Sequence, residues 1–382
     1  MSPIKTLTTS SELEKLVEEL LSEDFVTIDT EFIRETTYWP QLCLIQIAGQ
    51  NQAVLIDPLS PNMSLDSLSH LLQSNITCVF HSGRQDLEIF FNLFSSLPRH
   101  VADTQIMAMV CGHGDQIGYE KLVESFCHQK LDKSQRFTDW SKRPLHDAQK
   151  RYALADVTYL RDIYEKLQQE LIEQGRTNWV QEEHEKLIDL KNYLHDPTLA
   201  WQRLKIRDNQ DKIFPALCAL AELRERYAQT KNIPRSRVFK DDALIQIASA
   251  RPQTKESLFH LRAVKQQGME KTLVEKILML MRNELPQIAP PKSWKQNRGP
   301  KPETLIAMLR MLLKISSDRH AVAPKLLASA EDIDNFARGH EICAPDDWRY
   351  PLFWEEAVAF RNGELSLKWN CTKKDVEIVR TS

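Results

Sequence analysis

The stretch Phe25-Val-Thr-Ile-Asp-Thr-Glu31 decides how the first part of the chain folds. Its first four residues are mostly apolar or β-branched and predict a short strand. Asp29 and Glu31 follow two residues apart, so a strand would carry both carboxylates on one face. Two carboxylates that close repel each other unless they are protonated or share a cation. The pair suggests a divalent-metal site, although a strand that runs into an acidic turn would leave the same pattern.

The composition describes a globular protein of two or three domains. The chain has 382 residues, 42% of them hydrophobic and 27% charged, and only 10 are glycine. It contains no apolar run of about 18 residues and no apolar core near its N-terminus, so we expect neither a membrane span nor export. Its 7 scattered cysteines form no Cys-x-x-Cys pair, which argues against a disulfide framework and a zinc finger. We therefore expect a cytoplasmic protein.

The net charge of −3 conceals an asymmetry between the two halves. Residues 1–176 carry 16 Lys and Arg against 25 Asp and Glu, whereas residues 177–382 carry 34 against 28. An acidic half that binds metal and a basic half that binds nucleic acid would produce this distribution, and so would ordinary variation of surface charge.

The periodicity after the first strand alternates between strands and helices up to about residue 103. Ser11-x-x-Glu14 is a capping-box pattern that would begin a helix before the first strand. From Thr104 to Arg176 the pattern is almost wholly helical. This order predicts an α/β domain with a mixed sheet. Its expected strands are 25–29, 42–48, 53–57, 77–81 and 101–103, and its expected helices include 65–73, 84–94 and 145–174.

The rest of the chain is predicted to be helical. We expect a first domain at 1–176, a connecting helix at 177–207, one helical domain at 208–288 and a second, divergent one at 303–382. The linker at 289–302 is rich in proline and contains Lys292, Lys295, Arg298 and Lys301 but no acid. The fold class is therefore an α/β domain followed by two all-α domains.

Two further acidic motifs accompany Asp29 and Glu31. In His81-Ser-Gly-Arg-Gln-Asp86 a strand ends and a helix begins, so Asp86 lies in a first helical turn, where a carboxylate also serves the helix dipole. Tyr152 and Asp156 are four residues apart and share one face of the long helix. A half-buried tyrosine beside an exposed aspartate would explain that second pair equally well.

Taken together and in this order, these residues resemble the tyrosine branch of the DEDD superfamily of 3′–5′ exonucleases. The sister branch has histidine where this chain has Arg151. Further stretches are similar to the ribonuclease D family within that branch, namely Thr37-Tyr-Trp-Pro-Gln-Leu-Cys-Leu-Ile-Gln-Ile47 and Asp139-Trp-Ser-Lys-Arg-Pro-Leu145. The stretch from Asn232 to Ala248 resembles the helical domain that this family shares with RecQ-type helicases. The resemblance implies a ribonuclease H-like exonuclease domain at 1–176.

The resemblance also implies a two-metal mechanism. Two divalent cations, Mg²⁺ or Mn²⁺, would lie on Asp29, Glu31, Asp86 and Asp156. Asp29 would bridge both ions, Glu31 and Asp156 would complete one site, and Asp86 would reach the other. Tyr152 would orient the attacking water, because a free phenol has a pKa near 10 and is a poor base at neutral pH.

The expected function is that of a 3′–5′ exoribonuclease that releases 5′-mononucleotides, with tRNA precursors and other small structured RNAs as substrates. A DNA-directed exonuclease and a non-catalytic RNA-binding adaptor are the alternatives. No obligate protein partner is evident, so we expect a monomer. Phe32, His81, Arg235, Arg237 and Lys240 are candidate RNA contacts, and each of them could equally serve packing or lie on a solvated surface.

Overall fold

The computed structural model describes residues 4–204, 211–265, 269–285 and 301–380. Its contacts divide the chain into two compact units. The first contains Met1–Glu31, Cys43–Asp189 and Pro300–Ser382, and the second contains Phe32–Leu42 and Leu190–Gly299. The predicted linker at 289–302 lies outside the described residues except for Lys301 and Pro302.

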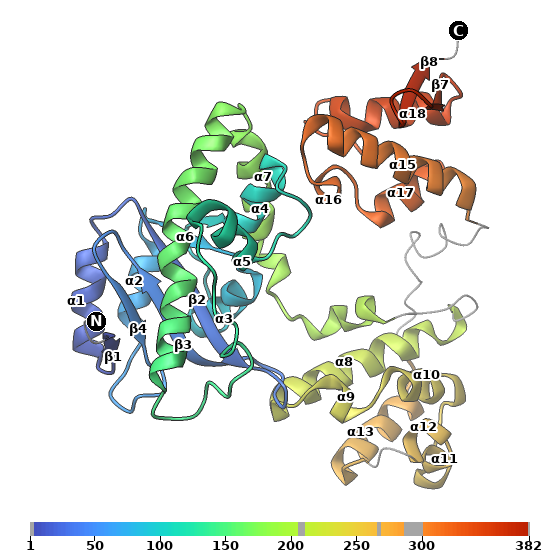
Figure 1. Ribbon diagram of the computed structural model, residues 1–382. Helices are drawn as coiled ribbons and strands as arrows, with labels where there is room; N and C mark the ends of the chain where they lie inside the picture. Colours follow the sequence, from blue (N-terminus) through green and yellow to red (C-terminus); the bar gives the residue numbers. More distant parts are fainter. Residues whose placement is uncertain (1–3, 205–210, 266–268, 286–300, 381–382) are drawn as a thin grey trace. The chain divides into compact units, whose positions relative to one another are not determined.

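A six-stranded mixed sheet forms the centre of the first unit (Figure 1); the sequence predicts a mixed sheet and five of these strands, but not β1. Its order is β1-β4-β3-β2-β5-β6, with β3 and β4 antiparallel and the pairs β1–β4, β2–β5 and β5–β6 parallel. The apolar runs of β2 and β5 suit central strands that are covered on both faces. The strands are Thr6–Leu7, Phe25–Ile33, Gln41–Ala48, Ala53–Ile56, Thr77–Phe80 and His100–Asp103.

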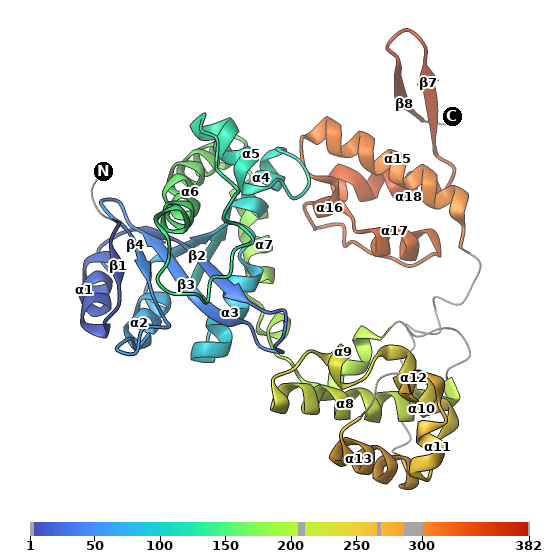
Figure 2. The same ribbon diagram turned by 60° about the horizontal axis from the view of Figure 1, so that its bottom comes forward.

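Helices cover both faces of this sheet. Figure 2 shows α1, α2 and α3 on one side of it and α4, α5 and α6 on the other. The long helix α6 contacts β4, β5 and α4, so its N-terminal turns lie against the sheet beside β2. The elements are α1 (Ser10–Leu20), α2 (Asp66–Gln73), α3 (Arg84–Phe94), α4 (Thr104–Cys111), α5 (Tyr119–Leu122), η1 (Val123–Cys127), α6 (Asp147–Glu173) and α7 (Thr177–Leu187).

The first unit also contains the C-terminal helices. They share a core that includes Leu312, Phe336, Phe353 and Trp354, and this core also contacts Trp179 of α7. Beyond the predicted helices, this region carries an antiparallel hairpin of β7 and β8, which the sequence analysis did not foresee. Its elements are α15 (Glu303–His320), α16 (Pro324–Leu327), α17 (Ala330–Ala337), η5 (Tyr350–Trp354), α18 (Glu355–Arg361), β7 (Leu365–Asn370) and β8 (Asp375–Arg380).

The second unit is a compact group of helices around one apolar core, which includes Leu220, Leu244 and Ile277. The segment 32–42, which joins β2 to β3, belongs to this core through the buried ring of Tyr38. The elements are η2 (Leu190–Asn192), η3 (Pro197–Arg203), η4 (Asp211–Ile213), α8 (Phe214–Lys231), α9 (Arg235–Val238), α10 (Asp241–Ala250), α11 (Lys255–Phe259), α12 (Arg262–Lys265) and α13 (Lys271–Arg282).

A buried polar cluster ties the segment 32–42 to α8. Glu225 has 1% of its surface exposed, and its carboxylate accepts hydrogen bonds from Tyr38, Arg235 and Arg203. Asn232, at the left-handed end of α8, accepts from the backbone N–H groups of Tyr38 and Trp39, both at 3.0 Å. A buried carboxylate with three donors and a positive partner is fully satisfied, so this cluster specifies how segment 32–42 docks.

We expect Asn232→Ala to lower the free energy of unfolding of the second unit by roughly 1–2 kcal/mol, because two hydrogen bonds are lost and alanine disfavours positive φ. Asn232→Asp is the matched control, since aspartate keeps the acceptor and tolerates the same backbone conformation. Urea unfolding of the full chain, followed by tryptophan fluorescence, measures both. Equal stability of the two variants would contradict the role of the side-chain oxygen.

Three sequence predictions differ from the structure. The connecting helix expected at 177–207 ends at Leu187, and the described residues after it form only the short helices η2 and η3. Helix α1 begins at Ser10, and its capping box uses Thr9 and Glu12 rather than Ser11 and Glu14. Residues 128–146 contain no helix, although the pattern from Thr104 to Arg176 predicted an almost wholly helical region. This 128–146 segment is held by polar contacts that local periodicity does not encode.

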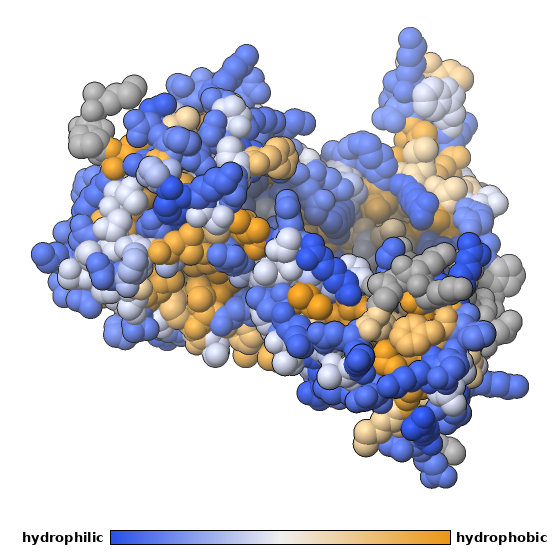
Figure 3. Space-filling view, turned by 90° about the horizontal axis from the view of Figure 1, so that it is seen from below, coloured by the Kyte–Doolittle hydropathy of each residue, from blue (hydrophilic) through white to orange (hydrophobic). Residues whose placement is uncertain are grey.

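The surface is mostly hydrophilic on the face that Figure 3 shows, with apolar side chains gathered in patches. Among the described residues, no helix combines the length and the hydrophobicity that crossing a membrane requires.

Candidate active site

The carboxylates of Asp29, Glu31 and Asp156 converge at one place in the first unit. One ligand oxygen from each lies within 4.8 Å of the others, and all three side chains are partly exposed. Asp29 and Glu31 come from β2, and Asp156 comes from the third turn of α6. Three hard oxygen ligands at this spacing are suited to a divalent cation such as Mg²⁺ or Mn²⁺.

Two hydrogen bonds fix the turn of α6 that carries Asp156. The hydroxyl of Tyr119 donates to the Ala155 carbonyl at 2.8 Å, and the hydroxyl of Thr27 donates to the Val157 carbonyl at 2.8 Å. Thr27 lies two residues before Asp29 on β2, so the second bond joins the two elements that supply the ligands. The residues on both sides of Asp156 are therefore anchored, which limits movement of its carboxylate relative to Asp29.

Asp86 is placed by the turn that precedes α3. Both carboxylate oxygens of Asp103 accept from this turn, one from the N–H of Ser82 at 3.0 Å and the other from that of Gly83 at 2.8 Å. A side chain at Gly83 would come within 2.4 Å of Phe80, so this position requires glycine. Asp86 is buried and accepts from the Thr30 hydroxyl at 2.5 Å, which places it beside the strand of Asp29.

Burial raises the pKa of all four carboxyl groups, and nearby negative charges add to the effect. Burial, followed by the charge of Asp156, raises the pKa of Asp29 well above its usual value. Burial, followed by the charge of Asp29, does the same to the pKa of Asp86. Burial, followed by the charges of Asp29, Asp156 and Asp86, raises the pKa of Glu31 to about 10. Such crowding of negative charge is costly without a cation, and so the site fits the metal dependence of the family that the motifs resemble.

Tyr152 lies against this cluster. Tyr152 opposes the rise in the pKa of Asp156 that burial causes, and its ring lies 6.2 Å from the ring of the buried Trp140. Burial, followed by the charges of Asp156 and Glu31, raises the pKa of the Tyr152 phenol above its usual value. A phenol with a raised pKa stays protonated at neutral pH and donates a hydrogen bond, so it can orient a group but does not abstract a proton.

The candidate RNA contacts have different surroundings. Phe32 is half-buried in β2, directly after Glu31. His81 bonds the Thr104 hydroxyl through Nδ1 at 3.0 Å, and burial lowers its pKa. Arg235 donates to Glu225 and Tyr38, so an RNA contact there would cost one of these bonds. Arg237 and Lys240 are exposed.

Sequence reasoning missed the residues that support the site. Thr27, Thr30 and Tyr119 act through their hydroxyl groups, and neither hydrophobic periodicity nor a motif marks such groups. Arg136 also acts on the carboxylates, since its charge opposes the rise in the pKa of Glu31 and of Asp156 that burial causes. The only sequence signal for Arg136 is its place beside Phe137 in a polar segment.

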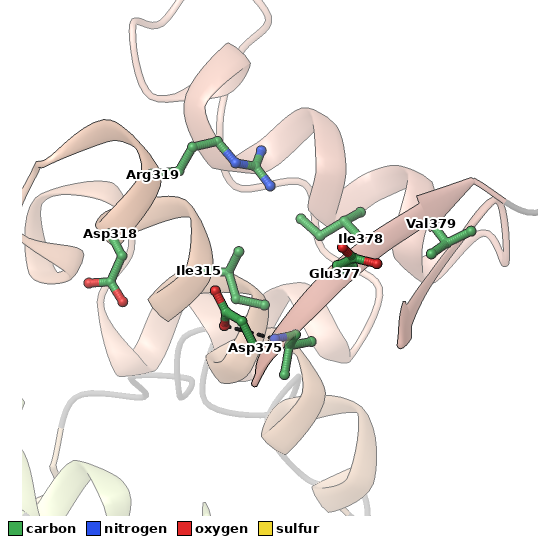
Figure 4. A pocket seen from close by; sticks show the side chains of 8 residues that line it. Ile315, Asp318, Arg319, Asp375, Glu377, Ile378 and Val379 are labelled. Atoms are coloured by element: carbon green, nitrogen blue, oxygen red, sulfur yellow. Dashed lines mark hydrogen bonds between the residues drawn. The ribbon is translucent and has the colours of Figure 1, made fainter. Parts of the chain in front are cut away.

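Away from the carboxylates, a hollow of about 620 Å³ lies between the last turns of α15 and β8 (Figure 4). Its charged side chains have partners close by. Asp318 pairs with Lys314, Arg319 with Glu356 and Glu377 with Lys373. Because these charges are already paired, the hollow offers little to a ligand, and we assign no function to it.

Comparison with known proteins places the chain in a class. Residues 4–172 match a family model described as 3′-5′ exonuclease, and residues 214–280 match the HRDC domain. The fold and the carboxylate cluster thus define a 3′–5′ exonuclease with helical accessory domains.

The relatives narrow the class to a family. The chain is 43% identical to the ribonuclease D of Jannaschia sp. over 95% of its length and 96% of the relative's, and 42% identical to that of Gluconacetobacter diazotrophicus over 94% and 93%. The crystal structure of Escherichia coli RNase D superposes with a TM-score of 0.79 at 27% identity, covering 94% of this chain and 99% of the other. The chain belongs to the ribonuclease D family, and it is a 3′–5′ exoribonuclease.

Proposed function

We propose that this exoribonuclease removes 5′-mononucleotides one at a time from RNA 3′ ends, with tRNA precursors as its first substrates. The observation that carries the proposal is the convergence of Asp29, Glu31 and Asp156 within 4.8 Å, beside Asp86. Hydrolysis of a phosphodiester needs positive charge near the oxygens on which negative charge develops, and these side chains supply none. These carboxylates are the groups that would hold the metal ions that supply this positive charge.

Two divalent cations fit the donor set. Asp29, Glu31 and Asp156 would hold such ions, with Asp86 beside them. When bound, such ions polarise the scissile phosphate and make water a better nucleophile. The chain's own contribution is to hold the four carboxylates in register, through Thr27 and Tyr119 around Asp156 and through Thr30 at Asp86.

Tyr152 and Glu31 would position the reacting groups. The protonated phenol of Tyr152 is a hydrogen-bond donor that can orient the attacking water toward the last phosphodiester. Glu31, on the same face of β2 as Asp29, would accept from the terminal 3′-hydroxyl. A free 3′-hydroxyl would therefore be needed for productive binding, which is the reason for action from the 3′ end.

The second unit would bind the body of the RNA. It contains the HRDC match, and residues 201–283 carry 17 Lys and Arg against 9 Asp and Glu. The exposed Arg237 and Lys240 are suited to contacts with phosphates. Arg235 serves the Glu225 cluster instead. No contact with another copy is needed to complete the site, so we propose a monomer.

The test is incubation with a 3′-extended tRNA and a single-stranded DNA of matched 3′ sequence, with Mg²⁺ or Mn²⁺. We expect stepwise shortening of the RNA, release of 5′-mononucleotides and complete inhibition by EDTA. Faster digestion of the DNA than of the RNA would favour the DNA-directed alternative. Binding of RNA without digestion by the metal-loaded protein would favour the adaptor.

A further inference from the structure

Phe137 is the most exposed of the large hydrophobic side chains described, with 91% of its surface accessible to solvent. It lies in the 128–146 segment, which has no helix or strand. A single exposed aromatic is common in proteins and needs no explanation by itself. Phe137 differs from an ordinary exposed aromatic side chain in its neighbours and in the way its segment is anchored.

The segment is tied to the first unit on both sides of Phe137. Before it, Lys133 forms an ion pair with Glu120, whose charge also acts on Asp156. After it, the hydroxyl of Thr138 accepts from the buried Gln149 of α6 at 3.1 Å. Farther on, Arg143 donates to Asp57 at 2.6 and 2.7 Å and to the Cys43 carbonyl at 2.6 Å. Phe137 is therefore held out in solvent by an anchored turn rather than by a loose loop.

The residue beside it is a cation, in a segment that reaches the acidic site because the Trp140 ring lies 6.2 Å from the ring of Tyr152. The Arg136 guanidinium lies 5.3 Å from the centre of the Phe137 ring. Its positive charge acts on Glu31, Tyr152 and Asp156 against the effect of burial on their pKa values. Within the described parts of the chain, no hydrogen bond or ion pair holds this guanidinium. An exposed aromatic ring and an available guanidinium thus stand together at the edge of the acidic site.

This pair complements the end of an RNA strand. Single-stranded nucleic acids are held by aromatic rings that stack on bases and by cations that meet phosphates. A site with four carboxylates repels phosphates, so a cation at its edge favours their approach. A guanidinium also binds two phosphate oxygens at once in fixed geometry.

We propose that Phe137 and Arg136 form a clamp for the 3′ end of the RNA, in which Phe137 stacks on a base of the last two nucleotides and Arg136 binds a phosphate there. This clamp rests on the proposed function and adds the residues that recognise the substrate's end. Stacking does not discriminate strongly among bases, so the clamp tolerates any 3′-terminal sequence.

A binding measurement tests the clamp without turnover. The full-length protein is titrated in Ca²⁺, in place of Mg²⁺ or Mn²⁺, against a short single-stranded RNA with a 5′ fluorophore. We expect Phe137→Ala to weaken binding by about 5- to 150-fold, as the loss of one stacked base predicts. Phe137→Trp should restore it. Leu93→Ala removes another exposed apolar side chain, on α3, and should leave binding unchanged.

RNAs that lack one base identify the contact. Two RNAs are used, one without the base of the last nucleotide and one without the base of the penultimate nucleotide. For one of these RNAs, wild type and Phe137→Ala should bind equally tightly, because the base that stacks on Phe137 is missing. Unchanged binding by Phe137→Ala, or a deficit of the same size on both abasic RNAs, would overturn the stacking contact. Failure of the wild type to digest RNA is a separate result that bears on the proposed function alone.

The salt dependence tests Arg136. Removing one phosphate contact to a single strand should reduce the slope of log Kd against log salt concentration by about 0.7 for Arg136→Gln. Arg99→Gln changes an exposed arginine just before β6 and should leave the slope unchanged. Equal slopes for Arg136→Gln and the wild type would overturn the phosphate contact.

Discussion

Asp29→Asn is expected to abolish digestion, lowering its rate by at least about a thousandfold, and at the same time to stabilise the metal-free protein. The first effect follows because Asp29 belongs to the carboxylate cluster that would hold divalent metal. The second follows from the pKa. Burial and the nearby charge of Asp156 raise the pKa of Asp29, so its ionised form opposes folding. Asparagine has the same shape without that charge.

The stabilisation has a defined dependence on pH. A carboxyl whose pKa is higher in the folded than in the unfolded protein takes up protons on folding, so wild-type stability falls as pH rises above the unfolded value of about 4. Glu31, whose pKa is raised to about 10, and Asp86 also make stability fall as pH rises. The advantage of Asp29→Asn should therefore be small near pH 4 and grow toward pH 8.

Thermal unfolding in EDTA between pH 5 and 8, and then with added Mn²⁺, measures these effects. Added metal should raise the Tm of the wild type and raise that of Asp29→Asn much less, since binding stabilises only a protein that has the site. Asp24→Asn is the control, because Asp24 is exposed just before β2. Wild-type activity in Asp29→Asn, or a Tm in EDTA no higher than that of Asp24→Asn, would contradict this account.

The sequence predicted most of the fold because the sheet and the long helices carry strong periodic patterns. The central strands have apolar runs that are buried on both faces, and α6 repeats Ala153, Val157, Leu160 and Ile163 on one buried side. The order of the carboxylate motifs could also be predicted, although β2 continues past Asp29 and Glu31 to Ile33 and the strand was expected to end at Asp29.

The sequence did not predict features that depend on contacts between distant residues. The 128–146 segment is fixed by Lys133–Glu120 and Arg143–Asp57, which join residues 13 and 86 positions apart. In the sequence, Arg235 resembles part of a surface basic patch, whereas in the structure it pairs with the buried Glu225. At α1, two overlapping capping patterns compete, and Thr9 prevails because Glu12 accepts from both the Thr8 and the Thr9 N–H groups.

The second large effect concerns the attachment of the C-terminal helices to α7. Arg349 has 9% of its surface exposed and donates to Glu182 at 3.0 Å, to Glu183 and to the Leu326 carbonyl at 2.8 Å. It also covers the ring of Trp348, which stacks on Trp179 of α7 at 4.5 Å. This arrangement, here called the Arg349 cluster, joins two parts of the first unit through one buried cation.

We expect Arg349→Ala to lower the free energy of unfolding by about 3 kcal/mol, near the lower end of the range for breaking a buried ion pair. Glu183 keeps Lys186 as a partner, which limits the loss. Arg349→Lys should recover only part of it, since an ammonium group cannot reproduce the planar fork that meets Glu182, Glu183 and a carbonyl together. Urea unfolding followed by tryptophan fluorescence measures both variants.

Arg319→Ala provides the matched control for this second effect. Arg319 also pairs with a glutamate in the C-terminal region, Glu356, at 2.7 Å, but its side chain is 42% exposed. Solvent screens such a pair, so we expect a loss of at most about 1 kcal/mol. If Arg349→Ala and Arg319→Ala lowered stability equally, burial of the Arg349 cluster would not be what attaches the C-terminal helices to α7. A clear difference would mean that these helices stabilise the exonuclease domain through a single buried cation.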